Sequence, residues 1–414
     1  MLWLPEIWEQ FYAYKLSLVP NGSFEKELRG FIDGKMYLPV CHMIADGQRF
    51  PLPKKAVISK MDTAKKRVVY TYPEPENTVL KMLTWLLLRR YNDVFSENLY
   101  SFRPGRSAKD AIRRLQSVPG IREMYSYKAD ISNYFNSVPV PKLLPTLAEV
   151  LSGDPELLLF LSGLLNETEV LDGNEAGRQS VITEQKGIMA GTPLSAFYAN
   201  LYLRDLDRRF EEAGIPYARY SDDMILFAGS REETEEQAAY VRAFLQERGL
   251  QLNPDKEEFR GPEEGWTFLG FSFCGGIIDI APASVKKIKG KMRRKSRALR
   301  RWACRNEADP ERAAAAFIRV FNRKLMGDSP GRTESRECTD GIRENDLTWS
   351  RWFFSVINTD KSLQEIDHYA QECIRFLMSG KHTKARFYIR YEEMKSLGYR
   401  SLVHAYYCKE AADQ

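Results

Sequence analysis

The sequence predicts an α+β protein with a mostly helical C-terminal region. The chain has 414 residues, of which 43% are hydrophobic and 12% aromatic, so it can form a large core and is too apolar for a disordered protein. Short runs of β-branched and aromatic residues alternate with helical patterns up to residue 283, and the pattern after that is helical and basic. We therefore expect a helical N-terminal extension (1–50), an α+β body (51–283) and a helical C-terminal region (284–414).

The composition argues against several classes of protein. No run approaches the ~18 apolar residues that cross a membrane, and the N-terminus lacks a basic stretch followed by an apolar one. Six dispersed cysteines without a CxxC pair, and only four histidines, argue against a disulfide scaffold and a zinc site. We expect a cytoplasmic protein without a membrane partner.

The N-terminal half alternates between helices and strands. Aromatic residues at helical spacing predict a packed helix within the first 50 residues. Asn77 or Thr78 is the expected cap of a long amphipathic helix. The elements expected after the first helix are a proline-broken loop at 48–55, a strand at 67–72, helices at 77–91 and 107–116, and a strand at 126–131.

Two later helices have clear boundaries in the sequence. Thr192 followed by Pro193 predicts the start of a helix that ends at Gly214. A Ser-x-x-Glu capping box at 230–233 predicts the start of another, which ends at Gly249.

Two adjacent acids occupy the turn between two short strands. Apolar runs at 218–220 and 224–227 flank Asp222 and Asp223. Crowded carboxylates are costly unless a cation neutralises them, and Mg²⁺ is a hard cation that prefers oxygen ligands. The alternative for an isolated Asp-Asp pair is an exposed turn.

A second strand supplies another acid. Asp130 and Ile131 end the strand expected at 126–131, so Asp130 converges with the Asp-Asp pair if the two strands are neighbours. Such a cluster could hold two Mg²⁺ ions, or Mn²⁺ in their place, about 4 Å apart for in-line phosphoryl transfer. The expected metal ligands are Asp130, Ile131, Asp222 and Asp223.

The segment 284–305 is strongly basic. It contains eleven lysines and arginines and no acid, whereas the whole chain has a net charge of +5, so the remainder carries −6. A compact basic element indicates polyanion binding, and the alternative, a solvated helix, usually mixes both signs of charge. The residues that we expect to contact nucleic acid here are Lys291, Arg293, Arg294, Arg297 and Arg301.

Six short segments form an ordered set of motifs. They read LYSFRPGRSA (99–108), DISNYF (130–135), GIMAGTPLS (187–195), YSDD (220–223), LNPDK (252–256) and FLGF (268–271). In this order they resemble the motifs of reverse transcriptases, specifically those of the bacterial group II intron-like lineage. The first motif is highly specific, and the resemblance spans roughly residues 54–273.

The resemblance implies a right-hand polymerase, with fingers and palm at 51–283 and a thumb within 284–414. It implies an RNA-directed DNA polymerase, a nucleotidyltransferase whose partners are an RNA template, dNTPs and a DNA product. Asp130 and Asp222 would bind both metal ions, and Asp223 would support the cluster. These three are the expected catalytic residues.

Further site residues follow from the resemblance. Phe135 lies five residues after Asp130, where the family places an aromatic ring beneath the incoming sugar. Tyr134 is the alternative, although strand alternation would point it to the opposite face. Arg103 and Arg106 are expected to touch the template or the fingers backbone, with a structural role as the alternative for Arg103. The expected dNTP-binding residues are Lys66, Arg67, Phe135, Gly191 and Lys256.

The subfamily rests on fewer residues. Ala190 stands where the family commonly has Gln, the thumb lacks the VTG motif of retrons, and no His/Cys pattern indicates an endonuclease. The segments 384–388 and 397–404 look like the C-terminal end of the unknown-group, or defence-associated, reverse transcriptases, which often copy a small non-coding RNA in antiphage systems. The alternatives are an endonuclease-free intron maturase or RNA-binding scaffold, and a template-independent or protein-primed polymerase of an abortive-infection system. The sequence leaves open whether the chain has a protein partner or forms a homo-oligomer.

Overall fold

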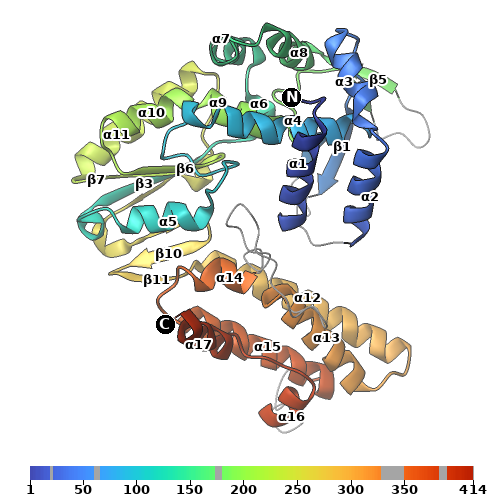
Figure 1. Cartoon of the computed structure of the whole chain (residues 1–414). Coiled ribbons are helices and arrows are strands. Elements are labelled where there is room, and N and C mark those ends of the chain that lie inside the picture. Colours follow the sequence, from blue (N-terminus) through green and yellow to red (C-terminus); the bar gives the residue numbers. More distant parts are fainter. Residues whose placement is uncertain (19–21, 60–65, 173–179, 328–348, 382–388, 414) are drawn as a thin grey trace. The chain divides into compact units, whose positions relative to one another are not determined.

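The computed structural model describes residues 1–18, 22–59, 66–172, 180–327, 349–381 and 389–413 (Figure 1). The chain forms two compact units, Met1–Gly261 and Pro262–Gln414. Both units combine helices with antiparallel strand pairs, and helices predominate after residue 281, so the predicted α+β class is confirmed. No helix of the described residues is long and apolar enough to cross a membrane. The motif segment at 384–388 lies outside the described residues.

Three helices form the N-terminal region, where the sequence predicted one. They are α1 (Pro5–Leu18), α2 (Gly22–Asp33) and α3 (Tyr37–Ala45). Trp8 is fully buried, stacks on Tyr37 with ring centroids 4.7 Å apart and donates its indole N–H to the Leu2 carbonyl. The chain turns between α2 and α3 at Lys35, whose φ is 50°.

A mixed four-stranded sheet contains the first predicted strand. Its order is β2–β1–β4–β5, in which β1 pairs antiparallel with β2 and parallel with β4. Its strands are β1 (Lys54–Ser59), β2 (Lys66–Thr71), β4 (Glu169–Asp172) and β5 (Ser180–Thr183). The strand predicted at 67–72 is β2.

A second, antiparallel sheet of unit 1 has the order β6–β7–β3–β8. Its strands are β3 (Tyr125–Asp130), β6 (Tyr217–Tyr220), β7 (Asp223–Ala228) and β8 (Glu258–Arg260). The pairing of β3 with β7 places Asp130 opposite Asp223. Helix α11 (Arg231–Glu247) packs on β3 and β7 and begins at the predicted capping box of Ser230 and Glu233. This sheet therefore carries the acidic residues of both motifs on neighbouring strands.

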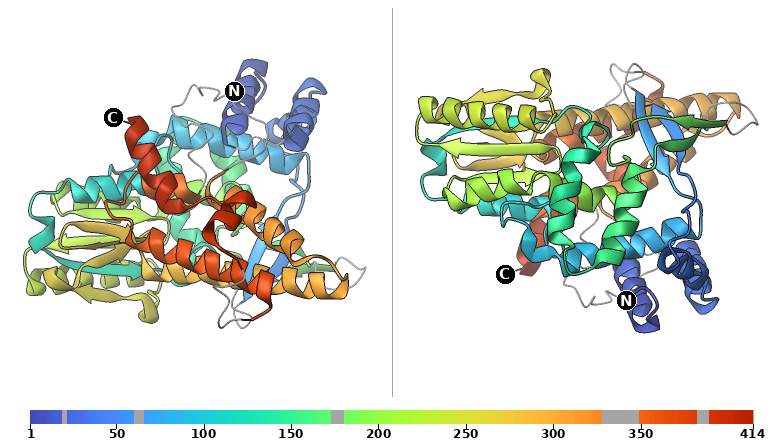
Figure 2. Two further views of the ribbon diagram at one scale, coloured as in Figure 1. Left: turned by 90° about the horizontal axis from the view of Figure 1, so that it is seen from below. Right: turned by 90° about the horizontal axis from the view of Figure 1, so that it is seen from above.

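The remaining helices of unit 1 surround these sheets, and α7 and α8 lie side by side (Figure 2). They are α4 (Glu76–Arg90), α5 (Ala108–Gln116), α6 (Tyr134–Ser137), α7 (Val140–Val150), α8 (Pro155–Asn166), α9 (Ser195–Tyr202) and α10 (Arg204–Glu212), with short 3₁₀ turns at Asn92–Val94, Ile121–Glu123 and Pro254–Lys256. Helices α5 and α10 contact β6.

Two predicted helix starts are wrong. Neither Asn77 nor Thr78 caps α4, because both lie inside it and donate to the carboxylate of Glu74. The helix predicted from Thr192 begins only at α9, because the Thr192 hydroxyl donates to the Met189 carbonyl within a turn. Leu203 then separates α9 from α10, so one predicted helix is two.

Unit 2 begins with an antiparallel sheet of three strands, in the order β11–β10–β9. The strands are β9 (Trp266–Phe268), β10 (Phe271–Cys274) and β11 (Ile277–Ile280), and Gly275 and Gly276 turn between the last two with positive φ. The sheet belongs with the C-terminal helices because Asn358 bonds to the backbone of Ile278. This compact unit starts earlier than residue 284, where the helical and basic pattern of the sequence begins.

Helices α12, α13 and α15 of unit 2 run alongside one another (Figure 1). The helices of this unit are α12 (Pro282–Arg305), α13 (Pro310–Leu325), α14 (Trp349–Phe354), α15 (Lys361–Ser379), α16 (Tyr391–Ser396) and α17 (Leu402–Asp413), and a 3₁₀ turn lies at Pro262–Glu264. The predicted basic helix is α12. Its apolar residues Val285, Ile288 and Met292 are buried, while Trp302 and most of its basic side chains are exposed.

Candidate active site

The structure brings the three acidic residues of the motifs to one edge of the antiparallel sheet. Asp222 lies in the turn between β6 and β7, and Asp223 begins β7 opposite Asp130. The backbone N–H of Ile131 donates to the Asp222 carbonyl at 3.0 Å, and the N–H of Asn253 donates to the Asp130 carbonyl at 2.8 Å. Backbone hydrogen bonds thus join the β6–β7 hairpin to the end of β3. The two strands are neighbours, which is the condition under which the sequence predicted that Asp130 converges with Asp222 and Asp223.

The carboxyl groups at this edge disfavour one another's charge. Burial raises the pKa of Asp223 to about 7; the charge of Lys128 opposes this shift, and Asp130 and Asp222 add to it. Burial and the neighbouring Asp130 also raise the pKa of Asp222. One oxygen of Asp223, Oδ1, is buried without a hydrogen-bond partner. A cation bound at this edge would therefore stabilise the charged form of these carboxyl groups.

Lys256 supplies one positive charge to the cluster. Its Nζ lies 2.6 Å from Oδ2 of Asp130. Burial lowers the pKa of Lys256, but the bond to Asp130 and the charges of the three acids outweigh this and raise it. Sequence reasoning expected Lys256 at the dNTP, and the structure instead pairs its ammonium with an expected metal ligand.

The donor set fits a hard divalent cation without being preassembled. Carboxylate oxygens are the ligands that Mg²⁺ prefers, and Asp223 Oδ1 is a buried acceptor without a donor. In the part of the chain that the structure describes, no three His, Cys, Asp or Glu side chains are already gathered as a metal-binding group. Asp130 is engaged with Lys256, so its binding of a cation would compete with this ion pair.

Phe135 and Tyr134 differ in burial, but not for the reason that strand alternation gave. Both belong to the short helix α6, which follows Asn133 in a left-handed conformation (φ 47°). Tyr134 is buried and donates its hydroxyl to the Ala199 carbonyl at 2.6 Å, whereas Phe135 is only partly buried and contacts Phe102 edge-on. Phe135 is the ring of the pair that remains accessible.

Gly191 holds its motif against the strand β2. Its φ is 102°, and a Cβ there would lie 3.0 Å from the Tyr70 carbonyl oxygen. The neighbouring Ala190 accepts the Tyr70 N–H at 2.8 Å and donates its own N–H to Asn136 Oδ1 at 3.2 Å. The need for glycine at this position is therefore explained by the close approach of β2.

Lys66 and Arg67 begin β2, and both are exposed. With the described residues they form no hydrogen bond or ion pair of their side chains. They remain free to meet an anion, and nothing in the described contacts connects them to the carboxylates.

Arg103 is structural, the alternative that the sequence had left open. It is buried, and its guanidinium donates to Asn92 Oδ1 at 3.0 Å and to the carbonyls of Ser96, Leu99 and Asn92. Its burial and these four acceptors favour the structural role. Arg106 is more accessible, but it is paired with the side chain and backbone carbonyl of Glu97.

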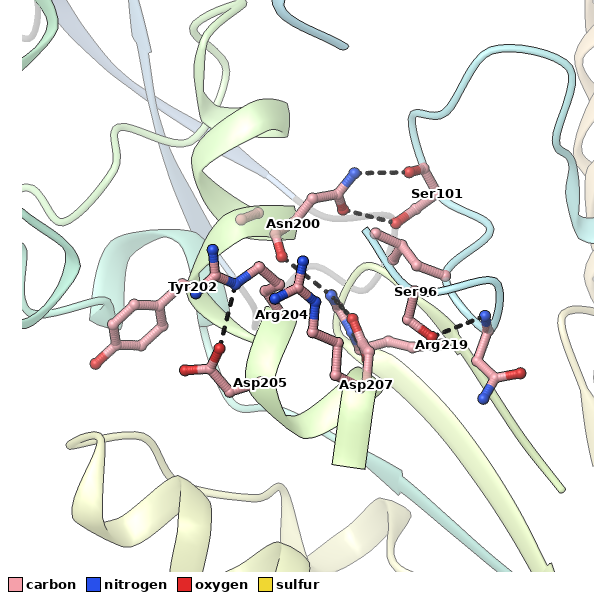
Figure 3. A network of polar contacts seen from close by, with 12 residues as sticks. Ser96, Ser101, Asn200, Tyr202, Arg204, Asp205, Asp207 and Arg219 are labelled. Atoms are coloured by element: carbon pink, nitrogen blue, oxygen red, sulfur yellow. Dashed lines mark hydrogen bonds and ion pairs between the residues drawn. The ribbon is translucent and has the colours of Figure 1, made fainter. Parts of the chain in front are cut away.

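Sequence reasoning missed a buried ion pair beside the acidic turn. Arg219 and Asp207 are both fully buried, and the guanidinium contacts both carboxylate oxygens, at 2.7 and 2.5 Å (Figure 3). The available signal was an arginine inside an apolar strand, directly before the YSDD motif. A charge in such a run indicates a buried partner.

The basic helix α12 presents its cations on several sides. Arg293 and Arg297 line a cavity of about 260 Å³ with Tyr369 and Phe376 of α15. Lys291 lines a second hollow, of about 180 Å³, between α12 and α13. Arg294 and Arg301 are exposed, and no ion pair of either is found among the described residues.

Residues 52–273, more than half of the chain, match the family described as reverse transcriptase (RNA-dependent DNA polymerase). No curated protein matches the chain.

Several solved polymerase structures are similar to the chain at low identity. Apo telomerase from Candida tropicalis has a TM-score of 0.48 at 11% identity, over 86% of this chain and 62% of that one. Telomerase from Candida albicans, in complex with a TWJ fragment of telomeric RNA, has 0.44 at 12%, over 84% and 62%. The RNA-dependent RNA polymerase of BmCPV has 0.44 at 11%, over 61% and 26%. The chain thus spans less than two thirds of the length of these proteins.

Proposed function

The chain belongs to the reverse transcriptase family, the RNA-dependent DNA polymerases, and we propose that it synthesises DNA on an RNA template at the edge formed by Asp130, Asp222 and Asp223. The observation that carries the proposal is the meeting of three acids from two motifs at one sheet edge, with a buried oxygen of Asp223 left without a partner. Structural carboxylates are normally satisfied by donors, so this arrangement favours a functional role.

The three carboxylates and Lys256 have different electrostatic roles in this proposal. Two Mg²⁺ ions, or Mn²⁺, held by Asp130 and Asp222 with the support of Asp223 and the Ile131 backbone, would lower the pKa of the primer 3′-hydroxyl and neutralise the triphosphate. Lys256 compensates the charge of Asp130 and so keeps the acids together before the cations arrive. With cations bound to the acids, its ammonium would be available to the anionic dNTP or leaving group.

The remaining substrate contacts are proposed from position. Phe135 lies next to the catalytic strand and is partly accessible, which suits a ring beneath the incoming sugar. Gly191 lets its loop approach β2, which carries Lys66 and Arg67 as candidates for the triphosphate. These assignments follow from the positions of the residues in the family motifs.

Primer extension on an RNA template tests the proposal. We expect dNTP incorporation by the wild-type chain with Mg²⁺ and none by Asp222→Ala or Asp223→Ala, with circular dichroism showing that each variant is folded. Undiminished incorporation by the folded double variant would remove the assigned site. Incorporation that needs no RNA would favour the template-independent alternative.

We further propose that the enzyme copies a dedicated non-coding RNA in antiphage defence, in the cytoplasm. Support comes from Ala190 and from the segment 397–404, which resemble the defence-associated group. In the structure this segment is held by the buried Asp367, which accepts the Tyr399 hydroxyl and the N–H groups of Leu402 and Val403.

Sequencing the nucleic acid that co-purifies with the protein tests this role. One enriched short RNA together with its complementary DNA supports it. An intron RNA without DNA favours the maturase alternative, and DNA without a matching RNA favours template-independent or protein-primed synthesis.

A further inference from the structure

The residue before the catalytic Asp222 is held at both of its backbone polar groups. Ser221 has a φ of 62°, a left-handed conformation that side chains other than glycine rarely adopt. Its N–H donates to the hydroxyl of Ser101 at 2.9 Å, and its carbonyl accepts from Nη1 of Arg219 at 3.0 Å. The unusual turn conformation therefore depends on two side chains that lie outside the turn.

Arg219 is itself fixed by fully buried partners. Its Nε and Nη2 donate to the two carboxylate oxygens of Asp207, and Nη2 also donates to the Asn200 carbonyl at 3.3 Å. Tyr217 donates its hydroxyl to the same carboxylate at 3.0 Å. A two-point pair with a carboxylate fixes the plane of a guanidinium, so only Nη1 is left to reach the turn.

Ser101 is fixed in a comparable way. Its hydroxyl donates to Asn200 Oδ1 at 3.1 Å, and Asn200 Nδ2 returns a hydrogen bond to the Ser101 carbonyl at 2.9 Å (Figure 3). Because the hydroxyl proton is used by Asn200, an oxygen lone pair faces the N–H of Ser221. The adjacent Tyr100 N–H donates to the Arg219 carbonyl at 3.0 Å, which ties the two segments together by the backbone as well.

We propose that Ser101, Asn200, Asp207 and Arg219 are positioning residues that hold the catalytic turn in its active geometry. All four are completely buried, so none of them touches substrate. Through Ser101, the motif at 99–108 supports the carboxylates from the buried side of the turn. The inference rests on the proposed role of Asp222 and Asp223.

The network ends at Ser221, where a small displacement of the backbone has a large effect on the reaction rate. Ser221 is covalently next to Asp222, so a shift of its peptide groups moves the carboxylate. A misplacement of about 1 Å at a reacting group can cost on the order of 100-fold in rate. Loss of the Ser101 hydroxyl therefore lowers kcat and leaves the KM for dNTP nearly unchanged, since the dNTP contacts remain.

The test compares Ser101→Ala with Ser96→Ala. Ser96 lies five residues before Ser101 and is 3% exposed, and its hydroxyl oxygen accepts the Asn98 N–H at 3.0 Å. Among the described contacts, this hydroxyl bonds neither to Ser221 nor to Arg219, whose backbone N–H instead donates to the backbone carbonyl of Asn98. Both variants lose one buried hydroxyl. We expect kcat per folded molecule to fall about 10- to 100-fold for Ser101→Ala and less than 3-fold for Ser96→Ala, with the thermal midpoint of each recorded in parallel.

Three results separate the possible failures. A wild-type chain without activity, or an active Asp222→Ala, contradicts the proposed function itself. If those two behave as proposed and both serine variants have the same kcat, the positioning role is wrong. If Ser101→Ala does not fold at the assay temperature, Ser101→Cys replaces it in the same comparison, because the thiol keeps most of the volume and bonds only weakly.

Discussion

The catalytic edge of unit 1 and the helix α12 of unit 2 both concentrate charge, but they hold it differently. Around the catalytic turn, Arg219 is fully buried, and its guanidinium donates to the Asp207 carboxylate and to the Ser221 carbonyl. Lys256 is paired with Asp130. On α12, Arg294 and Arg301 are exposed and pair with no described acid. One region fixes its charges, and the other leaves them available.

The difference fits the roles that we expect of the two regions, which are catalysis at the acidic residues and nucleic-acid binding by α12. Phosphoryl transfer depends on where charge is placed, so carboxylates need rigid support. Contacts to a phosphate backbone supply affinity without fixed geometry, and exposed cations suffice for them. Single substitutions at the catalytic edge should therefore cause large losses of activity. Substitutions on α12 should weaken RNA binding in small steps that depend on the salt concentration.

The largest effect is expected from Asp207→Asn. This change leaves the Arg219 guanidinium buried beside a neutral partner, which costs about 3–5 kcal/mol of the free energy of unfolding. Urea unfolding measures the loss. Replacing both residues, Asp207→Leu with Arg219→Met, should recover most of the stability but not kcat, because the bond to Ser221 stays lost. Full recovery of kcat by this double variant would contradict the contrast between the two regions.

The second prediction concerns pH and Asp223. Its pKa is raised from 3.8 to about 7 in the folded chain, so between about pH 4 and 7 the folded state binds a proton that the unfolded state has lost. Stability should therefore fall as the pH rises through this window, by roughly 1.4 kcal/mol for each unit of pKa difference at most. Urea unfolding with EDTA from pH 4.5 to 8 measures the trend, which Asp223→Asn should flatten. Equal slopes for the two proteins would mean that Asp223 does not titrate there.

Phe135 should decide sugar selection. Without its ring, the space beneath the sugar would admit a 2′-hydroxyl, so Phe135→Ala should lower dNTP-over-rNTP discrimination about 10- to 100-fold. Tyr134→Phe is the matched control, because it removes only the hydroxyl that bonds to Ala199 and leaves no cavity. Single-nucleotide incorporation with each sugar gives the ratio. A folded, active Phe135→Ala with unchanged discrimination would exclude the gate.

The smallest effect per residue is expected on α12. Neutralising Arg293, Arg294 and Arg297 to Gln should weaken binding of an RNA duplex and reduce the log–log salt slope by about one unit for each lost phosphate contact. Fluorescence anisotropy from about 50 to 300 mM salt measures the slope.

A control of equal charge change distinguishes α12 from a general charge effect. It neutralises Arg29, Arg113 and Arg231, arginines of unit 1 that each have an acidic neighbour. This control should leave the slope unchanged. The same decrease in both triple variants would mean that α12 has no special role.

Local patterns were reliable where neighbours in the sequence decide the structure. The capping box of Ser230 and Glu233 forms as predicted, and the strands beside Asp222 and Asp223 form a hairpin. The alternation expected for Tyr134 failed because Asn133 turns the chain into a short helix directly after β3. Pattern alone could not show this, since Tyr and Phe are compatible with either structure.

The sequence by itself determined that this chain carries the ordered motifs of a polymerase, an acidic pair on a hairpin and a basic helix, because each is a short-range or compositional property. Only the tertiary structure decided what Arg103 and Lys256 contact and that Ser101 holds Ser221, which is 120 positions away along the chain. Such partners are chosen by burial: a polar group removed from water must find a donor or acceptor wherever the fold supplies one, at any distance in sequence.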